Sequence, residues 1–382
     1  MKSVLSEHKT LHPDTVERRE LSAAAGAAVR ELAREICTTL DARAQVTMPD
    51  TARTLTDPAL LEQIDARVGE LPAEIRATLR PPATSAGAAI VGRLPLTDAE
   101  FGPTPPSWRE AASWSGDPAR RASSFEFDVV MLLLARSAGE PFGWHGQQGG
   151  RLVNNIVPAA GHENEQSGAS SKTLLSPHTE DAFHPARAHL LMLACLRNPE
   201  LVGTTVSSVR RVELSAAERA LLREPTLPIL PDVSYGTGHE NYSPTPLPTL
   251  WHNPDDAETL RYDPAYTPLD EADPEFRAAY ARLTAELERV CVTAALAPGE
   301  LLLVDNDVAV HGRVPFTARY DGTDRWLKRV NIRLPQRRRR SEEADENGYG
   351  QTIVSPFRGG LPAGRSSTER VAAHDRGPVE HP

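Results

Sequence analysis

The sequence predicts an α+β fold in which helices come first and many short strands follow, forming a strand barrel or sandwich. Three observations support this prediction. Before residue 80, apolar residues recur at intervals of three and four. Beyond residue 120 they form short runs bounded by Gly, Pro, Asn and Asp. The chain has 382 residues, of which 40% are hydrophobic, and this is enough for a large core.

Two amphipathic helices are expected in the first part of the chain. Residues 16–40 carry apolar side chains at helical spacing, from Leu21 to Leu40. A second helix covers roughly 58–79 and stops before the two prolines at 81–82. Residues 1–15 are polar and unpatterned, so we predict a disordered N-terminus.

Four segments beyond residue 120 are typical of strands. They are "FEFDVVMLLLA" (125–135), "HLLMLACL" (189–196), "ELLLVD" (300–305) and "KRVNIRL" (328–334). Two later helices are predicted, one near 274–292 and one in "SAAERALLRE", where Ser215 can cap the first turn.

The predicted organisation is a single domain over residues 16–340, with a helical part at about 16–120 and a strand core at about 121–340. Two segments lack periodicity, 159–173 and the proline-rich 224–256, and the second is predicted to be a lid. Residues 341–382 are rich in Gly, Arg and Pro and are predicted to be a disordered tail.

Composition argues against several classes of protein. Cys37, Cys195 and Cys291 are far apart and form no C-x-x-C pair, which argues against a disulfide framework or structural zinc and favours the cytoplasm. The net charge of −10 argues against general nucleic-acid binding. No signal peptide or membrane span is evident, and nothing indicates an obligate protein partner.

One basic run, Arg337–Arg340, is the exception to the acidic balance. It can be interpreted as a basic recognition patch for nucleic acid. The acidic stretch "SEEADE" (341–346) follows at once, however, and favours a solvated tail that compensates its own charge.

A first metal-binding candidate lies in "SPHTEDAFHP" (176–185). Alternate residues of a strand share a face, so His178 and Glu180 can present an imidazole and a carboxylate together. The spacing alone is weak, because composition predicts about one or two His-x-acid pairs. The chain has two, the other being His12-x-Asp14. His184 has the same parity as His178 and is the rival ligand.

A second candidate is His311 in "VDNDVAVHGR" (304–313), after a predicted strand and a turn at 305–307. Two histidines and one carboxylate that leave three positions open are typical of non-haem Fe(II) oxygen chemistry, because co-substrate and O₂ must both reach the metal. The alternative is that His311 is a partly buried, hydrogen-bonded histidine.

The segment "RWLKRVNIRL" (325–334) alternates between apolar and charged residues. A strand with guanidinium groups on its inner face must meet anions there, and Arg is well shaped to bind a carboxylate. The alternative is that this face meets solvent. One predicted face carries Val330, Ile332 and Leu334, and the other carries Arg325, Arg329, Asn331 and Arg333.

Together these residues resemble the Fe(II)/2-oxoglutarate-dependent oxygenases of the clavaminate-synthase-like branch. The resemblance is strongest to the free L-arginine and amino-acid hydroxylases of peptide-antibiotic biosynthesis, such as the viomycin-pathway type. It covers about residues 125–340 and is most specific in "GWHGQQGG" (143–150), the two His motifs and "RYDGTDRWLKRV" (319–330). It implies a distorted double-stranded β-helix (jelly-roll) core with flanking helices and a lid loop.

The resemblance also implies the cofactors and the site. Fe(II) would be held by His178, Glu180 and His311, with 2-oxoglutarate and O₂ as co-substrates. Arg325 would bind 2-oxoglutarate, with Thr204 or Thr205 of "GTTVSS" in support. The residues implied for the amino-acid substrate are Gln147, Glu180, Asp232, Ser234, Asp263 and Arg329.

The implied reaction is hydroxylation of an unactivated side-chain methylene, at C3 or C4 of a free L-amino acid, with succinate and CO₂ as co-products. The family has a second acid two residues after Asp263, and this chain has Ala265 there. The substrate therefore stays open between arginine and citrulline, with lysine or ornithine as an alternative. An oxidative cyclase or desaturase of the same family is a further alternative, and a metal-binding protein without turnover is a remote one.

Overall fold

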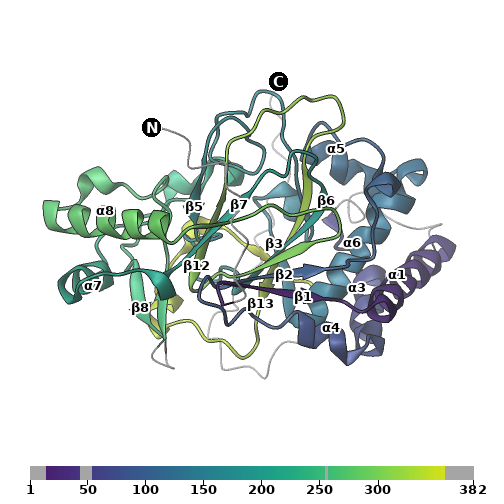
Figure 1. Cartoon of the computed structure of the whole chain (residues 1–382), viewed down its shortest axis with the longest axis horizontal. Helices are drawn as coiled ribbons and strands as arrows, with labels where there is room; N and C mark the ends of the chain where they lie inside the picture. The colour runs from purple at the N-terminus through teal and green to yellow at the C-terminus, as the bar shows by residue number, and fades with distance from the viewer. Residues whose placement is uncertain (1–13, 44–53, 254–256, 358–382) are drawn as a thin grey trace, which may run out of the picture.

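The computed structural model of the chain describes residues 14–43, 54–253 and 257–357. At its centre two β-sheets face one another, and helices cover their outer faces (Figure 1). The helices of the N-terminal part lie beside the larger sheet, and the two helices of the C-terminal half lie beside the smaller sheet.

The larger sheet has eight strands, in the order β1-β2-β11-β6-β13-β3-β14 with β4 also paired to β13. The smaller sheet has the order β10-β7-β12-β5, and β8 pairs with β9. All pairs are antiparallel except β1 with β2. Their bounds are β1 Val16–Glu20, β2 Ala88–Gly92, β3 Glu140–Trp144, β4 Asn154–Ile156, β5 Leu175–His178, β6 Leu190–Arg197, β7 Thr204–Ser208, β8 Leu250–His252, β9 Glu258–Leu260, β10 Val292–Ala294, β11 Leu301–Asp305, β12 Ala309–Arg313, β13 Trp326–Arg333 and β14 Ile353–Val354.

The α-helices are α1 Ala23–Arg43, α3 Pro58–Arg67, α4 Ala73–Thr78, α5 Trp108–Ser113, α6 Pro118–Ala138, α7 Ala216–Arg223 and α8 Pro274–Arg289. The predicted helices near 58–79, 215–224 and 274–292 are confirmed by α3 with α4, by α7 and by α8. Ser215 caps α7 as expected, since its hydroxyl accepts a hydrogen bond from the backbone N–H of Glu218.

Strand β6 shows how the two layers share one chain segment. Leu190, Met192, Ala194 and Leu196 belong to the core beneath the N-terminal helices, whereas Leu191, Leu193 and Cys195 belong to the core between the sheets. Because successive strand residues point to opposite faces, one apolar run fills both cores. Two opposed, largely antiparallel sheets without a closed barrel are the arrangement of a jelly roll.

The predicted strand at 125–135 is wrong, because these residues belong to helix α6. Every side chain from Val129 to Ala135 is fully buried. The helix packs against the large sheet and against α1, α3 and α4, so residues 129–135 are apolar on all sides. A continuous apolar run carries no periodicity that separates a buried helix from a buried strand.

The predicted helix at 16–40 begins too early. Residues Val16–Glu20 form β1, which pairs in parallel with β2 at the edge of the large sheet, and the helix starts at Ala23. The apolar positions with helical spacing begin at Leu21, so the pattern itself does not cover β1. Residues 1–13, the greater part of the predicted disordered N-terminus, lie outside the described residues.

Two segments predicted to lack structure are ordered in part. Segment 224–256 contains strand β8 and an isolated bridge between Leu227 and Leu247, although 254–256 lie outside the described residues. Residues 341–357 contain the 3₁₀ helices Ser341–Asp345 and Gly348–Gly350 and strand β14, so the prediction of disorder there is wrong. Residues 358–382 lie outside the described residues.

No helix in the described ranges is long and apolar enough to cross a bilayer.

Candidate active site

Two histidines and one carboxylate converge where β5 and β12 pair. His178 ends β5 and lies directly opposite His311 of β12 in the ladder. Glu180 follows β5 by two residues. Its Oε2 lies 3.3 Å from Nε2 of His311 and 3.8 Å from Nε2 of His178. The possible ligand atoms of all three residues lie within 4.8 Å of one another.

The hydrogen bonds of these residues leave metal-binding atoms free. Nδ1 of His178 lies 2.8 Å from the backbone oxygen of Ser176, which can only accept, so in the neutral ring Nδ1 carries the proton and Nε2 offers its lone pair. Oε2 of Glu180 is buried without a hydrogen-bond partner. A buried carboxylate oxygen left in that state fits a cation, and this donor set is the one that non-haem Fe(II) uses.

The charges of the three residues are strongly coupled. Burial alone would raise the pKa of Glu180, but Arg329 and the two histidines hold it well below its usual range. Burial lowers the pKa of His178, yet the nearby carboxylates of Glu180 and Asp263 outweigh it and raise that pKa to about 9. Burial, followed by the charge of His178, lowers the pKa of His311 to about 4. The cluster is thus a carboxylate with one neutral and one readily charged imidazole.

The rival ligand His184 lies apart from this cluster. Its Nε2 is 3.1 Å from the backbone oxygen of Gln351, and its Nδ1 accepts a hydrogen bond from the backbone N–H of Ala186. Its ring packs on Trp144 with centroids 4.4 Å apart. The structure therefore brings His311, and not His184, to Glu180.

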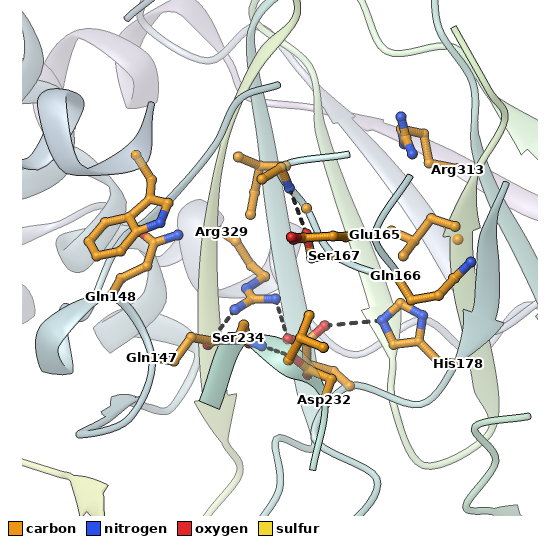
Figure 2. A pocket seen from close by; sticks show the side chains of 18 of the residues that line it. Gln147, Gln148, Glu165, Gln166, Ser167, His178, Asp232, Ser234, Arg313 and Arg329 are labelled. Atoms are coloured by element: carbon orange, nitrogen blue, oxygen red, sulfur yellow. Dashed lines mark hydrogen bonds and ion pairs between the residues drawn. The ribbon is translucent and has the colours of Figure 1, made fainter. Parts of the chain in front are cut away.

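A cavity of about 430 Å³ opens over the three residues. Its wall combines residues of both sheets with residues of the proline-rich segment and of the loop 159–173. Figure 2 shows Arg329, Gln147 and Ser234 on one side of this space and His178 on the other, with Glu165 and Ser167 of the loop nearby. Of the sequence-predicted site residues, only Thr205 does not line it.

Arg325 lies just before β13, with its guanidinium buried against β7. Its Nη2 donates to Oγ1 of Thr204 at 3.0 Å, and its Nε has no hydrogen-bond partner. Among the described residues no carboxylate forms an ion pair with it. Burial lowers the pKa of Arg325 to about 10. Thr205 follows Thr204 on the strand, faces the opposite side and stays away from the cavity.

Arg329 joins two polar residues of the cavity wall, Glu180 and Gln147, and also binds Asn154 behind them. Its Nη1 forms an ion pair with Oε1 of Glu180, and its Nη2 donates to Oε1 of Gln147 at 2.5 Å and to Oδ1 of Asn154 at 2.9 Å. Nε2 of Gln147 in turn donates to Oγ of Ser234 at 3.1 Å, as Figure 2 shows. A cation, an amide and a carboxylate are thus grouped in one wall.

Asp232 and Asp263 line the same cavity, and neither is paired with an arginine or lysine of the described residues. Asp232 accepts a hydrogen bond from the backbone N–H of Ser234 at 2.7 Å, and Asp263 accepts one from Ala265 at 3.1 Å. No Lys or Arg of the described segments lies within ion-pair distance of either carboxylate. Burial raises the pKa of both, and that of Asp263 to about 6. Both carboxylates are half-buried and available to a ligand.

Sequence reasoning missed Asp181, which adjoins Glu180 and adopts a left-handed backbone conformation with φ 54°. Its carboxylate accepts hydrogen bonds from Nε1 of Trp144 at 2.7 Å, from Nδ2 of Asn331 at 3.0 Å and from the hydroxyl of Tyr235. Burial, together with the charge of Glu180, raises its pKa to about 7. The acidic pair in "HTED" was the available signal, but it does not say which acid faces the metal.

The basic run at 337–340 is not a solvated tail. Arg337 pairs with Asp305 at 2.6 Å and with Asp307 at 2.9 Å, and Arg339 pairs with Asp307. Arg340 lies 3.7 Å from Glu343. The acids that compensate Arg337 and Arg339 thus lie some 30 residues earlier in the chain, next to His311, and not in the acidic stretch that follows.

Comparison with known proteins identifies the family of the chain. The family model described as "Taurine catabolism dioxygenase TauD, TfdA family" matches residues 123–331. This range contains His178, Glu180, His311, Arg325 and Arg329. The chain belongs to the TauD/TfdA family and is an Fe(II)- and 2-oxoglutarate-dependent dioxygenase.

Individual relatives of the chain have names that specify an amino-acid substrate. Enduracididine beta-hydroxylase of Streptomyces hygroscopicus is 35% identical, over 71% of this chain and 84% of the relative. L-ornithine/L-arginine 3-hydroxylase of Catenulispora acidiphila is 32% identical, over 64% of this chain and 75% of the relative. The crystal structure of the non-heme iron oxygenase OrfP with Fe and alpha-ketoglutaric acid is similar with a TM-score of 0.66 at 35% identity, covering 83% of this chain and 94% of that one.

Proposed function

We propose that the protein hydroxylates a side-chain methylene, at C3 or C4, of a free L-amino acid that ends in a guanidino or ureido group, arginine or citrulline. The observation that carries this proposal is the grouping of Arg329, Gln147 and Glu180 in the wall of a cavity that also contains Asp232 and Asp263. The two relatives named for enduracididine and for ornithine and arginine support this substrate class. The product would be a building block for peptide-antibiotic assembly.

His178, Glu180 and His311 are the proposed iron ligands, because their free atoms face one another without other partners. Bound Fe(II) supplies the activation of O₂ at the expense of 2-oxoglutarate, which leaves as succinate and CO₂. Arg325 and Thr204 are proposed to hold the distal carboxylate of 2-oxoglutarate. An arginine without a carboxylate partner in the described chain suits that anion.

The α-carboxylate and α-ammonium groups of the substrate are proposed to bind at Arg329, on the other side of the iron ligands from Arg325. Arg329 would turn its guanidinium to the α-carboxylate, and the oxygens of Glu180 and Gln147 that it now contacts would accept from the α-ammonium. This exchange gives Oε1 of Glu180 and Oε1 of Gln147 a donor in both states, which limits the cost of burying them.

The side-chain tip is proposed to lie against Asp232, Ser234 and Asp263. Two half-buried carboxylates that no arginine or lysine of the described residues pairs with favour a charged tip, and therefore arginine over citrulline. Citrulline stays the alternative because Ala265 stands where the family has a second acid. Lysine and ornithine also carry a cationic tip, but a primary amine cannot donate in the planar fork that a guanidinium offers to two carboxylates.

The decisive experiment is a turnover screen with Fe(II), 2-oxoglutarate and free arginine, citrulline, lysine, ornithine, homoarginine and enduracididine. Succinate and product mass are read together. Gain of one oxygen atom indicates hydroxylation, whereas loss of two hydrogens indicates a desaturase or cyclase. We expect oxygen gain with arginine, and Ala265→Asp to raise the arginine-to-citrulline rate ratio. Succinate release without substrate oxidation by any of these amino acids would refute the proposed substrate class.

We also propose that the predicted domain, residues 16–340, extends to residue 357. Glu343 and Glu346 of this extension pair with Arg187 and Arg261, which lie far earlier in the chain. Strand β14 completes the edge of the large sheet.

A further inference from the structure

Asn306 binds the backbone of Glu180 at the point where the ladder of β5 has ended. It is fully buried in the turn that joins β11 to β12. Its Oδ1 accepts from the backbone N–H of Glu180 at 2.9 Å, and its Nδ2 donates to the backbone oxygen of Glu180 at 3.0 Å. The same Nδ2 donates to the backbone oxygen of Ala188 at 3.0 Å. One side-chain amide therefore replaces the neighbouring strand that Glu180 lacks.

The second of these bonds controls the peptide that leads into Asp181. Asp181 has φ 54°, a conformation that non-glycine residues adopt rarely and that needs support from the surroundings. The bond to the Glu180 carbonyl holds this peptide plane and so sets the direction of the Glu180 side chain. Arg329 binds Oε1 of Glu180, which leaves Oε2 aimed at the two imidazoles.

The turn that carries Asn306 is held by the basic run. Arg337 binds Asp305 with both Nη atoms, at 2.6 Å and 2.9 Å, and also binds Asp307. Arg339 binds Asp307 and donates to the backbone oxygen of Ala188 at 3.0 Å, the same oxygen that Asn306 contacts. Asp305 and Asp307 flank Asn306 in the chain, so Arg337 and Arg339 hold the residues on both sides of Asn306.

We propose that Asn306 is a positioning residue for the carboxylate of Glu180, and that Arg337 and Arg339 act through the 305–307 turn to hold Asn306 in place. The inference rests on the proposed function, because it takes Glu180 as a metal ligand. It also assigns a role to the arginine run. Hydrogen-bonded groups behind a metal ligand keep it in the binding orientation, and their loss typically weakens metal binding by about 10- to 100-fold.

The test is a Co(II) titration of the metal-free protein, followed by the visible absorption of the bound ion, with the melting temperature of each variant measured beside it. Asn306→Ala is expected to weaken Co(II) binding by about 10- to 100-fold and to change the absorption spectrum. Arg337→Gln is expected to weaken it by a smaller factor. Arg338→Gln is the matched control, because Arg338 is exposed and has no ion-pair partner among the described residues.

Two outcomes overturn the inference. If Asn306→Ala folds and binds Co(II) with the affinity and the absorption spectrum of the wild type, Asn306 does not position Glu180. If Asn306→Ala does not fold, Arg337→Gln tests the inference instead. A lower melting temperature with unchanged Co(II) affinity in Arg337→Gln would show that the contacts of Arg337 with the 305–307 turn serve stability alone. Glu180→Gln separates this result from failure of the proposed function. If Glu180→Gln binds Co(II) as tightly as the wild type, the ligand assignment is refuted. If Glu180→Gln loses Co(II) binding while Arg337→Gln keeps wild-type Co(II) affinity, only the positioning role is refuted.

Discussion

Strand β13 carries buried cations on both faces, but the cations of the two faces differ in how completely they are paired within the chain. On the face toward α6, Nζ of Lys328 binds Oδ1 of Asp128 at 2.5 Å and Oγ of Ser124 at 3.2 Å, and Arg151 binds the other oxygen of Asp128. The side chains of Lys328, Asp128 and Arg151 are fully buried. Every charge on this face meets its partner within the chain.

On the face toward the cavity, pairing is incomplete. Nε of Arg329, Oδ1 of Asn331 and Oε2 of Glu180 are buried without hydrogen-bond partners, and so is Nε of Arg325 just before the strand. Buried polar atoms are nearly always paired in folded proteins, so such a cluster indicates a place where a ligand supplies the missing partners. Unpartnered Nε atoms also occur on ion-paired arginines elsewhere, such as Arg187. What distinguishes the cavity face is that its unpaired atoms include Oε2 of Glu180, which lies 3.3 Å and 3.8 Å from two imidazole nitrogens.

The largest effect is expected on the open face from His311→Ala. Loss of a ligand should reduce both Fe(II) affinity and turnover by more than the roughly 100-fold that marks loss of a supporting residue. His184→Ala is the matched control and should keep Fe(II) affinity, because its ring contacts Trp144 and the backbone of Gln351 instead. Fe(II) titration and succinate release measure both. The reverse pattern would mean that the ligand set is wrong.

The closed face should respond in stability instead. Asp128→Ala leaves Lys328 and Arg151 buried without their carboxylate, and removal of one partner from a buried pair costs about 3–5 kcal/mol. We expect the free energy of unfolding, measured by urea denaturation, to fall by that amount while the folded fraction keeps its Fe(II) affinity. Unchanged stability would show that the network is not structural, and the contrast between the two faces would be lost.

Arg325→Gln tests the open face without touching an iron ligand. Hydrogen bonds to a charged group are worth about 1.5–3 kcal/mol, so the KM for 2-oxoglutarate should rise roughly 10- to 100-fold. Stability should hold or increase, since the guanidinium is buried and no described carboxylate pairs with it. A marked fall in stability with an unchanged KM would place Arg325 with the closed network.

The smallest effect is a pH dependence of substrate preference. The pKa of Asp263 is raised to about 6, chiefly by burial, so the carboxylate is charged above pH 6 and neutral below it. If it binds a cationic tip, the ratio of kcat/KM for arginine to that for citrulline should fall roughly fourfold between pH 7 and 5.5. Taking the ratio removes titrations common to both substrates. Asp263→Asn should make the ratio independent of pH in this range, and a pH-dependent ratio in that variant would exclude Asp263 as the cause.

The residues that share a face of β13 can be read from the sequence alone. The alternation in 325–334 predicted a guanidinium face and an apolar face, and the structure has Arg329 in the cavity wall and Val330 with Ile332 in the helix-covered core. Such periodicity is a local property of the strand, so it survives any global arrangement. The spacing of His178 and Glu180 predicts that they share a strand face, but β5 ends at His178. Glu180 lies beyond the strand, where Asn306 binds its backbone, so tertiary contacts and not strand alternation place its carboxylate beside the histidines.

Only the tertiary structure decided which charges are paired. Sequence reasoning had no reason to bury Lys328 on the apolar face, because its partner Asp128 lies 200 residues away in a segment predicted to be a strand. The segment 341–357 has a polar composition and is ordered by ion pairs of Glu343 and Glu346 with Arg187 and Arg261. Hydrophobic patterns are read from neighbours along the chain, but the free energy of a buried charge depends on what folding places beside it.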